Sequence, residues 1–194
     1  MNKEQQAFKM PSTFAAMLGV LLAISLMCGS LLAITYAVTK DQIALVEQEK
    51  TKSAFVVVMP GFDNDPLAEK VVSSTEPGVA LFPLRKGAEL LGYAVATLTD
   101  KGYSGRIELM IGIKNDGSIT RYQVTKANET PGLGTNISSP DFQKQFEGKN
   151  PETFNLSVRK DGGQVDAISA ATISSRAVCD AIARAYRVFS EVKQ

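Results

Sequence analysis

Histidine is absent from this sequence, and cysteine occurs only twice in its 194 residues. Without histidine the chain has no Ser-His-Asp triad and no histidine metal site. Cys28 and Cys179 are far apart in the chain and cannot form a zinc or iron–sulfur site alone, and there is no CxxCH haem motif. We therefore expect no metal site and no catalytic residue of its own; any redox chemistry here needs an added organic cofactor.

Excess charge is also missing, since 21 basic and 20 acidic residues leave a net charge of +1. This balance gives no reason to expect a nucleic acid or a polyanionic partner. Charged residues are absent altogether from Pro11 to Thr39. As a helix this run would be about 43 Å long, which exceeds the roughly 30 Å of a membrane's hydrocarbon core. We predict a polar segment at 1–12 and one transmembrane helix at 13–39.

The flanks of this span leave two points open. The apolar run is longer than a typical signal-peptide core, so we expect an uncleaved anchor, with lipoprotein-like cleavage before Cys28 as the other interpretation. Lysines lie on both sides of the span, so the positive-inside rule does not settle its orientation. We favour a cytoplasmic N-terminus with the bulk of the chain outside.

Residues 40–194 are enough for one compact domain. A helix is expected to leave the membrane over 41–58 and to end before Pro60. Among the turn signals that follow, Asp116-Gly117 is the strongest. We predict short helices at 65–72 and 139–146, and strands at 93–99, 106–113, 119–126 and 154–160. This order predicts an α+β fold with a mostly antiparallel sheet and a packed C-terminal helix.

The last periodic segment predicts an amphipathic helix that begins close to Thr172. One broad face carries its apolar residues, which are Ala177, Val178, Ala181, Ile182, Ala185, Val188 and Phe189. The other face carries charges four residues apart, and we expect them to pair along the helix for a few tenths of a kcal/mol each. These pairs are Arg176–Asp180, Asp180–Arg184 and Arg187–Glu191.

Small and hydroxyl residues fill Asp166–Thr172, just where this helix begins. A helix start presents unpaired N–H groups and a positive dipole end, which favour a phosphate. The small side chains would let a bulky ligand approach the backbone, and a hydroxyl there could be esterified by the phosphate. An ordinary N-cap explains the same residue types without a ligand.

A second segment, Asn128–Asn136, combines a proline with two glycines, which fixes a tight backbone path between two elements. Glu129 and Thr130 would lie at its mouth. A plain surface turn is the other interpretation of this composition.

The two segments together resemble one family. Glu129–Gly134 matches its ETPGLG loop, and Asp166–Thr172 is similar to its flavinylation signal, usually D-G/A-x-S/T-G-A-T. The family is the covalent-FMN protein found both as the G subunit of the Rnf electron-transport complex and as the C subunit of the sodium-pumping NADH:quinone reductase. Tyr103–Ile107, Asp116–Ile119 and the single anchor also resemble it, and the short length is similar to that of the Rnf protein.

The resemblance implies a site. A flavin transferase would attach FMN to the Thr172 hydroxyl through a phosphoester, and the small residues Ser169, Ala170 and Ala171 would admit the phosphate. The expected contacts to the flavin ring are Glu129, Thr130 and Leu133. Ala170 departs from the family's usual glycine. A positive φ at this position would make the added methyl group costly, whereas a requirement for smallness alone would be met.

The resemblance also implies a role. The subunit would relay electrons within an Rnf-type complex between ferredoxin and NAD, coupled to Na⁺ or H⁺ translocation. Its partners would be the other Rnf subunits, and its place the cell (inner) membrane, with the FMN-binding domain on the outer or periplasmic side. Two alternatives remain: an FMN electron carrier outside Rnf, such as one for quinone-linked or extracellular reduction, or a membrane-anchored scaffold without redox function.

Overall fold

The computed structural model of the chain describes residues 14–193, and the polar segment predicted at 1–12 lies outside them. The chain divides into two compact units, Met1–Gln48 and Glu49–Gln194. The domain boundary that we predicted at residue 40 stays a prediction. In both units, helices and strands form where their apolar side chains can pack against another element or face a membrane.

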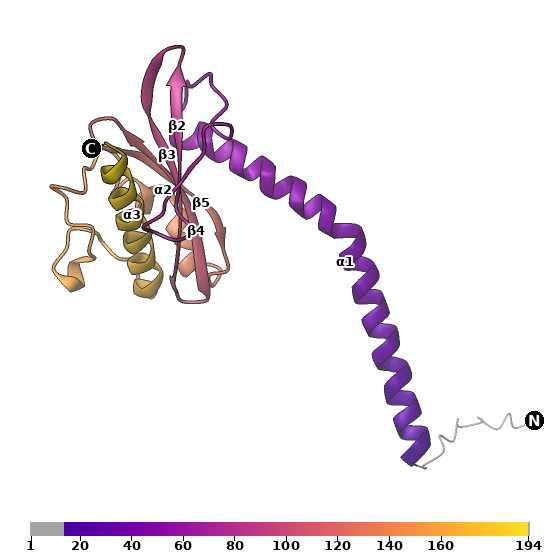
Figure 1. The fold of residues 1–194 in the computed structure, drawn as a ribbon. Coiled ribbons are helices and arrows are strands. Elements are labelled where there is room, and N and C mark those ends of the chain that lie inside the picture. Colours follow the sequence, from indigo (N-terminus) through magenta and orange to yellow (C-terminus); the bar gives the residue numbers. More distant parts are fainter. Residues whose placement is uncertain (1–13, 194) are drawn as a thin grey trace, which may run out of the picture. The chain divides into compact units, whose positions relative to one another are not determined.

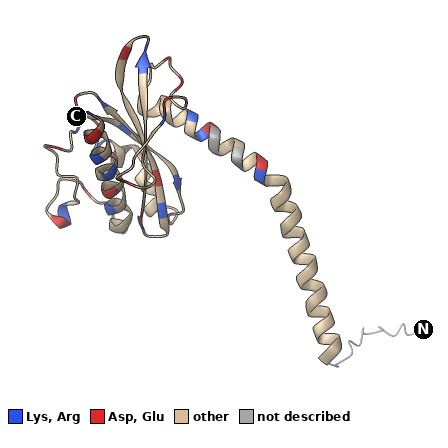
Figure 2. Ribbon diagram, viewed as in Figure 1, with Lys and Arg blue, Asp and Glu red and all other residues tan. Residues whose placement is uncertain are grey.

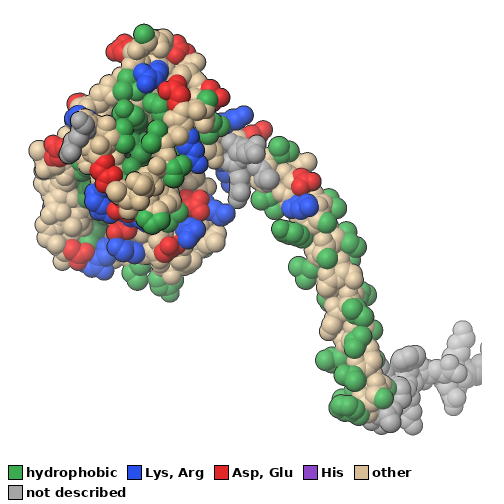
Figure 3. Space-filling model, viewed as in Figure 1, with side chains coloured by type: hydrophobic (Ala, Val, Ile, Leu, Met, Phe, Trp, Pro, Cys, Tyr) green, Lys and Arg blue, Asp and Glu red, His purple; other side chains and the backbone are tan. Residues whose placement is uncertain are grey.

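Helix α1 spans Phe14–Val58, and its part in the first unit has the character of a membrane span. Within Phe14–Ile43 the most apolar 18-residue window has a mean hydropathy of 2.4 and no buried residue, so this stretch is long and apolar enough to cross a membrane. Figure 2 shows this stretch without charges until its end, and Figure 3 shows apolar side chains along it. The Thr35 hydroxyl donates to the carbonyl of Leu31 at 2.8 Å, so its donor is satisfied within the helix.

The second unit contains one antiparallel sheet in the order β1-β2-β3-β4-β5 (Figure 1). Its strands are β1 (Val71–Val72), β2 (Ala80–Lys86), β3 (Glu89–Gly102), β4 (Gly105–Lys114) and β5 (Ile119–Ala127). The predicted Asp116-Gly117 hairpin is confirmed, since Lys114 N donates to Ser118 O at 2.9 Å. Adjacent strands follow one another in the chain, as hairpin connections require. The predicted α+β fold with a C-terminal helix is confirmed.

Successive residues of a strand point to opposite faces of the sheet, and both faces are covered. On one face, Leu81 and Val95 pack with residues of α3 (Thr172–Lys193), among them Phe189. On the other face, Ala80 and Phe82 pack against the end of α1. All seven apolar residues that we predicted for the inner face of the C-terminal helix are buried. The sheet is therefore the central layer between two cores.

Short elements connect β5 to α3. They are the 3-10 helix η1 (Gly134–Ser138), the helix α2 (Pro140–Gln143) and the 3-10 helix η2 (Arg159–Asp161). The expected helix at 139–146 is present but short, capped by Ser139, whose Oγ accepts from Phe142 N at 3.4 Å. The hydroxyl of Tyr122 on β5 donates to the carbonyl of Ile137, which fastens η1 to the sheet.

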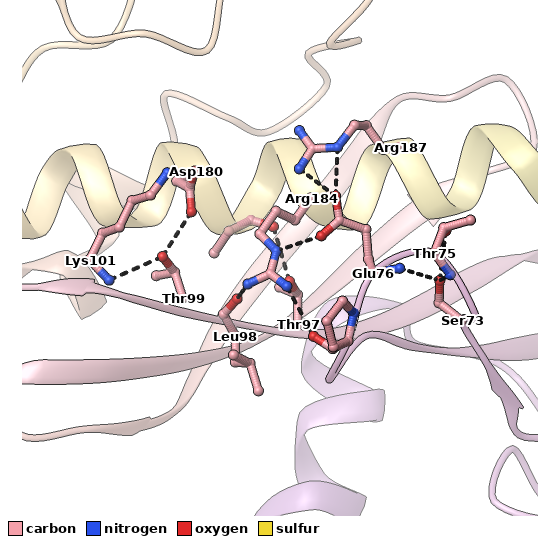
Figure 4. Close-up of polar contacts among 12 residues, drawn as sticks. Ser73, Thr75, Glu76, Thr97, Leu98, Thr99, Lys101, Asp180, Arg184 and Arg187 are labelled. Atoms are coloured by element: carbon pink, nitrogen blue, oxygen red, sulfur yellow. Dashed lines mark hydrogen bonds and ion pairs between the residues drawn. The ribbon is translucent and has the colours of Figure 1, made fainter.

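The outer face of α3 is held by residues from other elements (Figure 4). Glu76, in the β1–β2 loop, accepts from Arg184 Nε at 2.9 Å and from Arg187 Nη2 at 2.6 Å. Asp180 pairs with Lys101 Nζ at 2.6 Å. The expected pairing along the helix is therefore wrong, because in the part of the chain that the structure describes these charges bind partners across the fold.

Two other predicted elements are wrong. Residues 65–72 form no helix: the Asp65 carboxylate accepts from Leu67 N at 3.1 Å in a local turn, and the chain then enters β1. Residues 154–160 form no strand: a loop with one isolated bridge, between Val158 and Val165, leads into η2.

Candidate functional site

The two segments singled out in the sequence meet in one cleft of about 420 Å³. The β3–β4 hairpin, the loop after β5 and the first turn of α3 form its walls. The residues that line it are Tyr103, Glu129, Thr130, Leu133, Gly134, Ala170, Ala171, Thr172, Ile173 and Ser174. Six of the seven predicted site residues are in this set, and the exposed Ser169 is not.

The first turn of α3 leaves backbone donors directed away from the helix body. The first helical hydrogen bond runs from Ser175 N to Ala171 O at 3.0 Å. Among residues 14–193, no acceptor pairs with the N–H groups of Thr172, Ile173 or Ser174. Free N–H groups and the positive end of the helix dipole together favour an anion. The described structure thus leaves three backbone donors without a protein acceptor at this helix start.

The turn before α3 is closed by Ser175, which is fully buried. Its Oγ donates to Ala171 O and accepts from Ile168 N, both at 3.0 Å. Ala171 N donates in turn to Ile168 O, also at 3.0 Å. These bonds hold the backbone of Ala170 at φ +61°, the one positive φ among the non-glycine residues that the structure describes. An L-residue there costs about 1–2 kcal/mol, so the glycine usual in the resembled family would fit with less strain.

Glu129 is buried, with 5 % of its surface exposed, and it joins two walls of the cleft. Its Oε2 accepts from Ser174 Oγ at 2.7 Å, and its Oε1 accepts from Ser104 N at 3.2 Å. The loop after β5 therefore reaches both α3 and the β3–β4 hairpin through a single side chain. A buried carboxylate is stable only when such donors satisfy it.

The loop that carries Glu129 is a compact turn, as its proline and glycines predict. Thr130 O accepts from Leu133 N at 3.2 Å and from Thr135 N at 3.3 Å. Gly132 has φ +75°, a conformation that side chains disfavour. This turn directs Leu133 into the cleft wall with 42 % of its surface exposed.

Hydroxyl groups near the helix start differ in availability. Ser174 and Ser175 are buried and engaged in the bonds given above. The side chain of Thr172 is half-buried and lines the cleft, and no described residue forms a hydrogen bond with its hydroxyl. In the first turn of α3, Thr172 is therefore the hydroxyl that lines the cleft without a hydrogen-bond partner among the described residues.

Four lining residues were not predicted: Tyr103, Gly134, Ile173 and Ser174. Tyr103 and Ile173 expose 67 % and 47 % of their surfaces and extend the apolar wall. The position of Ser174 two residues after Thr172 could have suggested it. The approach of Tyr103 depends on the β3–β4 hairpin folding back beside the loop, which spacing along the chain does not reveal.

Near the same end of the fold, Arg176 anchors α3 to the preceding loop. Its guanidinium donates to both carboxylate oxygens of Asp161, at 2.7 and 2.8 Å. These hydrogen bonds hold the pKa of Asp161 below its usual range. On the same helix, burial raises the pKa of the Cys179 thiol to about 12, so this cysteine is a packing residue and not a nucleophile.

Known proteins are similar to this chain over the part that carries the cleft. The family model "FMN-binding domain" matches residues 102–187, which include both cleft segments. A protein of Methanosarcina acetivorans, named as the G subunit of an ion-translocating oxidoreductase complex, is 40 % identical over 167 residues, covering 84 % of this chain and 87 % of that protein. Its counterpart of the same name in Aliivibrio fischeri is 33 % identical over 179 residues, covering 86 % and 85 %.

Among solved structures, the C subunit of the Na⁺-translocating NADH-quinone reductase from Parabacteroides distasonis is 26 % identical, with a TM-score of 0.47 and coverage of 67 % of each chain. The sequence relatives match more than four-fifths of this chain at 33–40 % identity. The chain therefore belongs to the family of G subunits of ion-translocating oxidoreductase complexes.

Proposed function

We propose that this chain is the membrane-anchored flavoprotein subunit of an Rnf-type oxidoreductase, and that it carries FMN as a phosphoester of Thr172. The observation that carries the proposal is the meeting of the two segments in one cleft, with Thr172 at the start of α3. Its hydroxyl is free, and the amides of the same turn have no partner among residues 14–193. This is the arrangement that a phosphate attached to that hydroxyl requires.

The residues of the cleft fit FMN. Its volume of about 420 Å³ lies within the range of small-molecule sites. The free amides at the helix start suit the phosphate, and Tyr103, Leu133 and Ile173 offer apolar surface to a planar ring. Ala170 and Ala171 line the cleft with small side chains, which supports the approach of a bulky group to this turn. The ring contacts of Glu129, Thr130 and Leu133 are part of this proposal.

A covalent bond is also physically useful here. Phosphates are often held by arginine or lysine, but neither lines the cleft among the residues that the structure describes. Helix amides alone add only about 0.3–1 kcal/mol for a surface anion. The Thr172 ester would retain the cofactor where ion pairs do not. FMN would supply one- and two-electron transfer, and the residues of the cleft would hold it.

The apolar helix and the family support the place that we propose for this chain in a complex. An apolar helix suited to a membrane precedes the cleft-bearing unit, and the relatives are named as subunits of ion-translocating oxidoreductase complexes. We propose that the other Rnf subunits are its partners and that a flavin transferase loads it. Electrons would pass between ferredoxin and NAD, coupled to Na⁺ or H⁺ movement. The N-terminus would be cytoplasmic and the FMN-binding domain, 40–194, outside.

The test is the intact mass of the protein from its native membrane, followed by mapping of the tryptic peptide that begins at Asp161. We expect an added mass of FMN less one water on Thr172. Thr172→Ala should remove the flavin completely while the thermal unfolding transition stays, and Thr172→Ser should retain flavin because it keeps the hydroxyl. An unmodified Thr172 in membranes that contain the transferase would contradict the covalent mechanism and favour a scaffold role.

A further inference from the structure

We propose that Glu129 is a fixed negative charge that lowers the midpoint potential of the flavin held in the cleft. This inference rests on the proposed function, because it requires FMN at this site, and it adds the residue that sets the cofactor's potential. Glu129 lines the cleft two residues after the end of β5, and 5 % of its surface is exposed. Solvent therefore screens its charge weakly.

The carboxylate is held in one place. Both of its oxygens accept hydrogen bonds, one from Ser174 Oγ and one from Ser104 N. It also fills space left by two glycines: a Cβ built at Gly134 would lie 2.5 Å from Oε2, and one built at Gly102 would lie 2.6 Å from Oε1. Rotation of the side chain would break both bonds and leave a void, so the charge cannot swing out of the cleft.

The charge is not neutralised by the protein. Its two hydrogen-bond donors, a hydroxyl and a backbone amide, are both neutral. In the described part of the chain, no lysine or arginine lines the cleft, and no ion pair involves Glu129. The formal charge that this wall presents to a ligand is therefore negative. The amides of α3 act on the phosphate, whose charge is the same in both redox states of the cofactor.

The sign of the effect follows from charge conservation. Uptake of two electrons and one proton leaves a flavin with one negative charge more than the oxidised form carries. A carboxylate nearby raises the free energy of this reduced form relative to the oxidised form. Glu129 thus makes the bound flavin a stronger reductant.

The experiment is a spectroelectrochemical titration, with dithionite and mediators, of full-length protein purified from membranes that contain the transferase. Glu129→Gln removes the charge and keeps the size of the side chain. Glu89→Gln is the matched control: it removes an exposed carboxylate at the opposite end of β3 from the cleft hairpin, roughly 40 Å along the strand. Ser174→Ala removes one hydrogen bond and keeps the charge. The intact mass of each variant is measured first.

We expect Glu129→Gln to shift the midpoint potential upward while Glu89→Gln leaves it unchanged. Ser174→Ala should shift it downward, because a carboxylate with fewer donors presents more of its charge. An unchanged or lower potential in Glu129→Gln, or an equal shift in Glu89→Gln, would overturn the inference. If Glu129→Gln does not retain flavin, Ser174→Ala decides: a downward shift supports the inference, and no shift or an upward one overturns it. Wild-type protein without FMN would instead overturn the proposed function, and this inference with it.

Discussion

The two long helices of this chain meet different surroundings. Over Phe14–Ile43, α1 is apolar and none of its residues is buried. Helix α3 is amphipathic, with one face in the core of the sheet and charged residues of its other face joined to loops. An apolar surface on all sides suits lipid, whereas a single apolar stripe suits a protein core. The same secondary structure thus serves an anchor in one case and a scaffold in the other.

The difference explains why the site lies at α3. A binding site requires groups held within a fraction of an ångström, and this requires support from more than one side. The first turn of α3 is fixed by Ser175 to the turn before it, by Ser174 to Glu129, and by Arg176 to Asp161.

The largest loss of stability is expected for a substitution on the face of α3 that packs in the core. Phe189 is 1 % exposed, and its ring packs edge-on against Tyr93 with centroids 5.8 Å apart. Phe189→Ala should lower the free energy of unfolding of the second unit by about 3–5 kcal/mol, because it removes a buried ring and leaves a cavity. Leu22→Ala, on the exposed surface of α1, should change it by less than about 0.5 kcal/mol.

Urea unfolding of the full-length protein in detergent, followed by near-ultraviolet circular dichroism of the tyrosines, measures both variants. Equal destabilisation by the two substitutions would mean that α1 supports the fold of the second unit along its whole length.

Exposed apolar residues of α1 and of α3 should respond differently when a charged residue replaces them. Leu26 in α1 and Val192 in α3 expose 63 % and 44 % of their surfaces. Leu26→Asp should cost about 2.5–3.5 kcal/mol of membrane insertion, because it places a carboxylate near the middle of the span. Val192→Asp should leave insertion unchanged. Fractionation of membranes after alkaline extraction measures insertion, and equal extraction of both variants would contradict the anchor.

The ion pairs on the outer face of α3 predict that the stability of the protein depends on pH. Hydrogen bonds from Arg187 and Arg184 hold the pKa of Glu76 below its usual value of 4.5. A lowered pKa in the folded state stabilises the protein above the unfolded pKa, and this contribution is lost as the pH falls through the folded pKa. Glu76→Gln should therefore cost about 1.5–3 kcal/mol at neutral pH, and its difference from wild type should shrink below pH 4.5.

Glu69→Gln provides the control, since its pair with Arg85 is about 40 % exposed on each side. Such a pair is worth about 0–1 kcal/mol. Unfolding curves at several pH values give both differences, and a loss for Glu76→Gln that does not depend on pH would argue against the ion pairs as its cause.

The smallest effect is a gain in stability just before α3. Ala170→Gly relieves about 1–2 kcal/mol of backbone strain at φ +61° and adds about 0.5–1 kcal/mol of chain entropy cost, so the net gain should be about 0.5–1 kcal/mol. Ala183→Gly, inside α3, should instead lower the free energy of unfolding by about 1 kcal/mol. Thermal unfolding measures both, and a loss in both variants would mean that Ala170 is not strained.

Much of the fold near the site could be predicted from the sequence. The apolar face of α3 and the Asp-Gly turn between β4 and β5 are local signals that the tertiary structure reinforces. The two cleft segments were found by composition and by family resemblance. Their meeting depends on the sheet order, which brings the end of β5 beside the start of α3.

The errors also have physical causes. Strand β2 was not predicted, and it contains Pro83, which cannot donate to a strand ladder. Pro83 O accepts from Asn64 Nδ2 at 2.9 Å, so its backbone faces a loop at a position where β1 pairs only with Ala80 and Leu81. No donor is needed there, and the proline is tolerated.

The segment 154–160 was predicted as a strand but does not form one. Phe154, Leu156 and Val158 alternate with polar residues as strand residues do, and all three contribute to the core around α3. In the described structure they have no partner strand beyond the bridge at Val158, so the segment buries the same side chains as an irregular loop. Periodicity predicts which side chains are buried but not whether a neighbouring strand is available.

The last turns of α1 determine where the chain can be cut for work in solution. Ala54, Phe55 and Val58 are buried beneath the sheet, and the Val58 carbonyl accepts a hydrogen bond from the Thr120 hydroxyl on β5. A soluble fragment that begins at Pro60 would lose these residues and expose one apolar face of the sheet to water. A fragment that begins at Glu49 would keep them and omit the span, and its start follows the boundary of the second unit.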